Sequence, residues 1–152
     1  MKYVLLFIAF LNIFFLSAQH AEKDAVQKTI EDFFEGFHQQ DSMRIKNTVH
    51  PDIVMQTIGK DSLGNAVLKH EKFNLFLNSI VSIPKTKKFE EKILSYAIQI
   101  DGKMANAWTT YEFWIDDTFS HCGVNSFQLF NEADRWKIIY IIDTRRKEDC
   151  NK

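Results

Sequence analysis

Residues 88–144, KFEEKILSYAIQIDGKMANAWTTYEFWIDDTFSHCGVNSFQLFNEADRWKIIYIIDT, decide the fold of this chain. Apolar side chains recur at every second position in four runs of this stretch, a period typical of strands. The runs cover residues 88–100, 104–115, 123–130 and 136–144. Polar segments separate them, and Asp101-Gly102 is a strong signal for a two-residue hairpin. The stretch therefore predicts a four-stranded antiparallel meander.

The residues before this meander show the period of helices. An apolar stripe between residues 21 and 39 predicts an amphipathic helix. The stripe consists of Val26, Ile30, Phe33, Phe34 and Phe37. Asp41 and Ser42 are suitable N-caps for a second, short helix that runs through about Val49. His50-Pro51-Asp52 ends that helix, because a residue before proline avoids the helical region.

Residues 53–58 are mostly β-branched or apolar and predict a strand, and residues 59–65 predict a polar loop or a hairpin turn. A third helix is expected over residues 70–81. The lysines that follow, together with Glu90 and Glu91, suggest a solvated loop. Helices segregated from a mainly antiparallel sheet predict an α+β fold in one domain.

The first nineteen residues have the order of a secretory signal peptide. Lys2 supplies a positive charge, an apolar run from Val4 to Leu16 follows, and Ser17 and Ala18 are small. The run is too short to span a bilayer core, which takes about 20 residues. We therefore expect a signal peptide over 1–19, a domain over 20–152, and an exported protein, periplasmic or secreted, with no membrane contact after cleavage.

The composition excludes several classes of function. Nineteen basic and twenty acidic side chains give a net charge of −1, which argues against nucleic acid as a partner. The five histidines are scattered without the spacing of metal motifs, so no metal site is expected. The five glycines are isolated, and without a glycine-rich phosphate loop no cofactor is expected.

Short motifs connect this order of elements to a known superfamily. They are His50-Pro51-Asp52, Tyr111-Glu112-Phe113, Ser120-His121-Cys122-Gly123, Trp136-Lys137-Ile138 and Asp143-Thr144-Arg145-Arg146. With them the chain resembles the nuclear transport factor 2-like superfamily, and within it the lumazine-binding subgroup of small secreted bacterial proteins. The resemblance implies a cone of helices packed into a strongly curved sheet, with a pocket between the helices and the concave face. Members include dehydratases, isomerases, cyclases and binding domains.

Strand alternation sorts residues 104–115 into two faces. The more apolar set is expected to face the core, and it contains Ala107, Thr109, Tyr111, Phe113 and Ile115. Phe113, together with Phe127 of the next strand, is expected to line a ligand pocket. Tyr111 would then place a hydroxyl in an apolar cavity. There it serves either as an acid or orienting donor for a ligand, or as a core tyrosine that is hydrogen-bonded to a backbone carbonyl.

Other polar candidates lie at strand and helix ends. His121 is either a general acid or base near neutral pH, or a turn histidine that forms a hydrogen bond with the backbone. Asp143 and Arg145 share a face, where they form either an anion clamp or a structural ion pair. A catalytic pair of Asp143 and His121 is a further hypothesis. His50 either reaches the pocket or caps the C-terminus of the second helix.

Cys122 and Cys150 are interpreted as a disulfide, because export places them in an oxidising compartment. In-register pairing around Asn131 and Trp136 puts Cys122 opposite Arg145, close enough for the tail to fold back. The alternative is a nucleophilic Cys122 beside His121, although adjacent strand residues point to opposite faces.

These observations predict an exported domain that binds a small, partly aromatic or amphipathic ligand in an apolar pocket. The first alternative is a cofactor-independent dehydratase, isomerase or hydrolase that uses His121 or Tyr111 with Asp143. The second is a structural homodimer joined through Trp108 and Trp114 on the outer face of the sheet.

Overall fold

The computed structural model describes the backbone of residues 2–150 and the side chains of residues 19–150. The expected signal peptide therefore lies almost entirely outside the described side chains. The elements are α1 (Lys2–Gln39), α2 (Ser42–Thr48), β1 (Val49–Lys60), β2 (Ala66–Glu71), α3 (Phe73–Val81), β3 (Phe89–Asp101), β4 (Met104–Ile115), β5 (Thr118–Glu132) and β6 (Arg135–Arg146). Within the part of the chain so described, no helix combines the length and the hydrophobicity needed to cross a bilayer.

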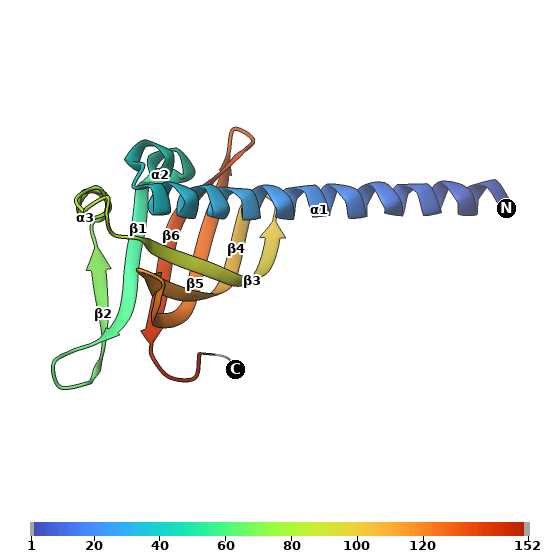
Figure 1. Ribbon diagram of the computed structural model, residues 1–152. Coiled ribbons are helices and arrows are strands. Elements are labelled where there is room, and N and C mark those ends of the chain that lie inside the picture. Colours follow the sequence, from blue (N-terminus) through green and yellow to red (C-terminus); the bar gives the residue numbers. More distant parts are fainter. Residues whose placement is uncertain (1, 151–152) are drawn as a thin grey trace.

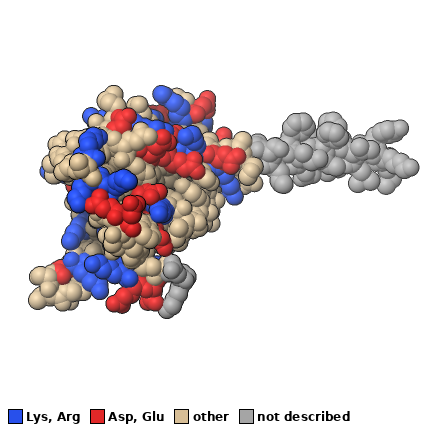
Figure 2. Space-filling model, viewed as in Figure 1, with Lys and Arg blue, Asp and Glu red and all other residues tan. Residues whose placement is uncertain are grey.

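The strands form one mixed sheet in the order β2-β1-β6-β5-β4-β3. β1 runs parallel to β6, and the other neighbouring pairs are antiparallel. The sheet curves strongly without closing, and α1 lies across its hollow side (Figure 1). This confirms the predicted α+β fold, with the β3–β6 meander as its larger part. Acidic and basic side chains are interspersed on the face seen in Figure 2.

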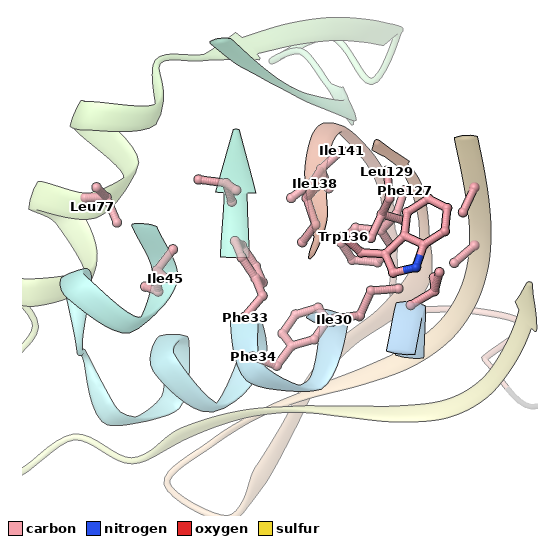
Figure 3. Close-up of a cluster of buried hydrophobic side chains, with 14 of the residues drawn as sticks. Ile30, Phe33, Phe34, Ile45, Leu77, Phe127, Leu129, Trp136, Ile138 and Ile141 are labelled. Carbon is pink, nitrogen blue, oxygen red and sulfur yellow. The ribbon is translucent and has the colours of Figure 1, made fainter. Parts of the chain in front are cut away.

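The apolar stripe of α1 packs into the hollow of the sheet. Val26 and Ile30 are fully buried, and Phe33 and Phe34 nearly so. Figure 3 shows the two phenylalanines together with the side chains of β5 and β6 that complete this core. Those side chains include Phe127, Leu129, Ile138 and Ile141. Burying this surface is the main stabilising contribution to the helix–sheet contact.

Two local predictions before the meander were wrong. The chain forms strand β2 over Ala66–Glu71, and α3 begins only at Phe73, so His70 is in a strand. β2 pairs with β1 at the edge of the sheet, and nearly all its residues are exposed. An edge strand that is exposed on both faces has no apolar alternation by which the sequence would reveal it.

The turns of the meander are shorter than expected, and one is shifted. The first hairpin turns at Gly102-Lys103, since Asp101 pairs with Met104. β5 already begins at Thr118. Between β5 and β6 the expected register holds at Asn131–Trp136, but an irregularity between Gln128 and Leu129 shifts it by one residue. Cys122 therefore lies opposite Arg146 rather than Arg145.

The predicted disulfide joins Cys122 and Cys150, with 5.6 Å between their Cα atoms. The bond holds the C-terminal tail against β5, and it excludes the alternative of a free nucleophilic Cys122.

Cys150→Ser is expected to lower the free energy of unfolding by about 3–4 kcal/mol, because the bond closes a loop with a sequence separation of 28 residues. Cys150 is the better position for the change, since Cys122 is buried and its replacement would disturb the core. Urea unfolding of the variant and of the reduced wild type measures the loss. Midpoints equal to that of the oxidised wild type would contradict the prediction.

Candidate functional site

A cavity of about 570 Å³ lies between α1, α3 and the concave face of the sheet. Its walls are divided between an aromatic part and a polar part. The aromatic part consists of Phe33, Phe34, Phe37, Phe76, Phe113 and Phe127. The polar part includes Glu91, Tyr111, His121, Asn125, Asp143 and Arg145. Six of the seven predicted ligand-binding residues thus line one cavity.

The aromatic walls hold one another in place. Phe76 of α3 stacks on Phe33 and Phe37 of α1, with ring centroids 6.1 Å apart in both pairs. Phe34 meets Phe127 edge to face. Side chains from three elements therefore give the cavity flat apolar surfaces, which suit a planar or apolar ligand.

Asp143 is held at the polar end by two donors. Its carboxylate accepts hydrogen bonds from Arg145 Nε at 2.7 Å and from the hydroxyl of Thr57, and Tyr111 Oη lies 3.4 Å away. The side chain of Asp143 is only 13% exposed. Asp143 and Arg145 thus form an ion pair, and since Arg145 also lines the cavity, both the structural pair and the anion clamp stay predictions.

Tyr111 is 2% exposed and donates its hydroxyl to the backbone carbonyl of Thr144 at 2.9 Å. This confirms the core tyrosine bonded to a carbonyl. Burial, then the carboxyl groups of Glu91 and Asp143, raise the pKa of Tyr111. The phenol therefore keeps its proton and donates it in a hydrogen bond to the backbone.

His121 lies at the rim of the polar end. Its ring stacks on Phe113 with centroids 5.0 Å apart, and its Nδ1 is 3.1 Å from Ser120 Oγ. Burial, and then the positive charge of Arg145, lower the pKa of His121. Among the described residues no hydrogen bond joins His121 to Asp143, so the proposed catalytic pair is not formed.

Glu91 is a polar cavity residue that was not predicted from the sequence. The expected strand over 88–100 does contain it, but the expectation of a solvated loop at Glu90–Glu91 is wrong, since Glu91 lies in β3 and faces the cavity. Asn125 Nδ2 donates to Glu91 Oε1 at 2.7 Å. His38 Nε2 accepts the backbone N–H of Glu91 at 2.9 Å. The available signal was strand phase, because Glu91 shares the inward face with Phe89 and Ile93.

The environment of Glu91 raises the pKa of its carboxyl group. Burial is the largest cause, and the charge of Asp143 adds to it. The hydrogen bond from Asn125 and the charge of Arg145 act in the opposite direction, and the balance raises the pKa of Glu91 to about 8. Three carboxyl groups therefore line the cavity: Glu71, Glu91 with its raised pKa, and Asp143 in an ion pair with Arg145.

His50 does not line the cavity. The second helix ends one residue earlier than expected, with Val49 as its C-cap. Val49 already pairs with Ile138 of β6, so His50 is in strand β1 and the helix-capping role is wrong. Its Nδ1 accepts the backbone N–H of Asp52 at 3.1 Å.

The inward set of β4 is confirmed as far as Phe113. Ala107 and Thr109 are buried, but Ile115, the last residue of β4, is exposed. Trp108 on the outer face is 54% exposed. Trp114 is partly buried and donates to Glu112 Oε2 at 3.1 Å. Dimerisation through the two tryptophans stays a prediction.

In the described part of the chain, no three His, Cys, Asp or Glu side chains gather as metal ligands would. The cavity offers instead aromatic faces and one protonated carboxyl, which suit an organic molecule.

A family model described as "Putative lumazine-binding" matches residues 21–140. No curated protein matches the chain. Among solved structures, an NTF2-like protein of unknown function from Pseudomonas putida is 14% identical, with a TM-score of 0.67, over 88% of this chain and 93% of its own. A protein from Mycobacterium tuberculosis, also of unknown function, is 11% identical, with a TM-score of 0.69, over 86% of this chain and 75% of its own. An NTF2-like "putative dehydratase" from Streptomyces avermitilis is 12% identical, with a TM-score of 0.64, over 84% of this chain and 98% of its own. These likenesses show the NTF2-like fold.

Proposed function

The chain belongs to the "Putative lumazine-binding" family, and from this premise we propose that its cavity binds a small, partly aromatic molecule. The observation that carries the proposal is the divided wall of the cavity. Six phenylalanines provide flat apolar contact surfaces, and a polar cluster at one end provides hydrogen-bonding groups that would orient a ligand. A volume of about 570 Å³ falls within the range of sites for small organic ligands.

We also propose that binding takes place outside the cytoplasm. The order of charge, apolar run and small residues in 1–19 supports export. A disulfide between Cys122 and Cys150 suits an oxidising compartment.

Native mass spectrometry of the processed protein, purified from its own periplasm or medium, tests the proposal. We expect a bound small molecule that leaves on denaturation. Ile141→Trp should reduce its occupancy, because Ile141 lines the cavity and an indole would fill it. Trp108→Ala is the control, since Trp108 lies on the outer face. Circular dichroism confirms that both variants fold.

An empty wild-type protein that also fails to bind lumazine or other planar aromatic compounds at millimolar concentration would contradict the proposal. The mass of the mature chain would report the expected cleavage near residue 19 in the same spectrum.

An acid–base enzyme is the second candidate, and Glu91 is the observation that favours it. A carboxyl that keeps its proton near neutral pH is suited to proton transfer. Tyr111 and Asp143 are both committed to structural hydrogen bonds, so Glu91 replaces them in this hypothesis. Incubating the released ligand with the protein separates the candidates, because only an enzyme changes the mass or the isomeric form of the ligand.

A further inference from the structure

The position of Glu91 indicates which functional groups a ligand in the cavity would carry. Its Oε1 is occupied by Asn125, which is 5% exposed and also reaches Thr109 Oγ1 at 3.4 Å. No hydrogen bond to Oε2 is formed within residues 19–150. Asn125 of β5 therefore orients the carboxyl group through Oε1. Oε2 is available to a ligand in the cavity that Glu91 lines.

The cation whose charge acts on Glu91 is already bonded to another carboxylate. That cation is Arg145, and its guanidinium donates to Asp143 at 2.7 Å. The negative charge of Asp143 opposes a second negative charge nearby. The other titratable groups around Glu91 or the cavity are His38 of α1, Lys69 and Glu71 of β2, Tyr111 of β4 and His121 of β5. His38 contacts the backbone N–H of Glu91, and Tyr111 keeps its proton.

A protonated carboxyl is a hydrogen-bond donor, whereas a carboxylate only accepts. A carbonyl oxygen or a ring nitrogen on the ligand fits that donor. An anionic ligand would meet the charge of Asp143, and a cationic ligand would bind the ionised form of Glu91 better. The aromatic walls add a preference for a flat, apolar body.

We propose, on the premise that the cavity binds a small molecule, that Glu91 carries a proton and donates it in a hydrogen bond to an uncharged aromatic ligand with a carbonyl or ring-nitrogen acceptor. Such a ligand is held in neutral medium and released in alkaline medium, where Glu91 ionises and the donor is lost. The raised pKa of Glu91, about 8, places this change slightly above neutrality.

Two neutral probes test the proposal by isothermal titration calorimetry. 2-Acetonaphthone carries a carbonyl acceptor, and 2-ethylnaphthalene has a similar shape without one; neither titrates. We expect the ketone to bind about tenfold more weakly at about pH 9.5 than at about pH 6, as the protonated fraction of Glu91 falls. The hydrocarbon should show no such change.

Two variants identify the residue responsible. Glu91→Gln keeps a donor at every pH, so ketone binding should become independent of pH. Glu90→Gln is the matched control, because the neighbouring side chain is 57% exposed and does not line the cavity, so its variant should behave as wild type. Circular dichroism at both pH values confirms folding.

The outcomes separate this inference from the proposed function. If neither probe binds the folded protein, the binding function fails and this inference with it. If both bind but the ketone shows no pH dependence, or Glu91→Gln keeps that dependence, only the role of Glu91 is overturned. Tighter binding of the ketone in alkaline medium would also overturn it.

Discussion

Gly123→Ala is expected to destabilise the protein by about 3–5 kcal/mol, a large effect for the addition of one methyl group. A Cβ at this position would lie 1.8 Å from the carbonyl oxygen of Thr144 and 2.8 Å from the hydroxyl of Tyr111. The contact with Thr144 is backbone on a paired strand and cannot be relieved by a side-chain rotation. β5 and β6 would have to separate, and the hydrogen bond from Tyr111 to Thr144 would be lost.

Chemical unfolding followed by circular dichroism measures this loss. Gly59→Ala is the matched control, because its added Cβ would come no closer than 3.7 Å to Lys69 Nζ. We expect that control to stay within about 0.5 kcal/mol of wild type. A Gly123→Ala variant as stable as the control would show that the strands can move apart there without loss of stability.

Glu91→Gln is expected to stabilise the protein by about 3–4 kcal/mol at alkaline pH and to have little effect at pH 4. Below the ordinary value of 4.5, the carboxyl is protonated in both the folded and the unfolded chain. Between 4.5 and about 8 the unfolded chain releases the proton while the folded chain keeps it. Stability that Glu91 provides in acid is therefore lost progressively as the pH rises through this window, and the loss levels off above about 8.

Urea unfolding across the pH range gives the free energy of unfolding of the wild type and of the variant. The difference between these two free energies at each pH tests the expectation. That difference should grow from pH 4.5 to about 8. Glu90→Gln should show no comparable difference, since Glu90 is exposed at 57% of its side chain. A constant difference between Glu91→Gln and wild type at all pH values would mean that Glu91 is already ionised in the folded protein.

The meander was predictable because its strands alternate between a buried and an exposed face. Residues 104–115 were predicted as a strand with the bounds that the structure shows, and the apolar set from Ala107 to Phe113 faces inward. The helical stripe from Val26 to Phe37 was equally clear. In each case one face is buried against a neighbouring layer, so the period is visible along the chain.

The edge strand β2 was not predictable by the same means, and the inward orientation of Glu91 was missed although the strand alternation indicates it. β2 is exposed on both faces, and the sequence pattern of an exposed strand does not differ from that of a loop. Glu91 was interpreted as solvated because it follows a run of charged residues. Its side chain faces inward because it alternates in phase with Phe89 and Ile93 along β3.

The sequence by itself determined the fold class and the family, because these follow from periodicity and from motifs within short segments. It also predicted the disulfide pair, from the expected oxidising compartment, and six of the residues that line the cavity. Only the tertiary structure decided their roles. Asp143 is in an ion pair with Arg145, Tyr111 donates a hydrogen bond to the backbone, and Glu91 faces the cavity with a raised pKa. The physical reason is that the charge state of a buried group depends on partners from other strands, whose positions are set by the register and irregularities of the assembled sheet.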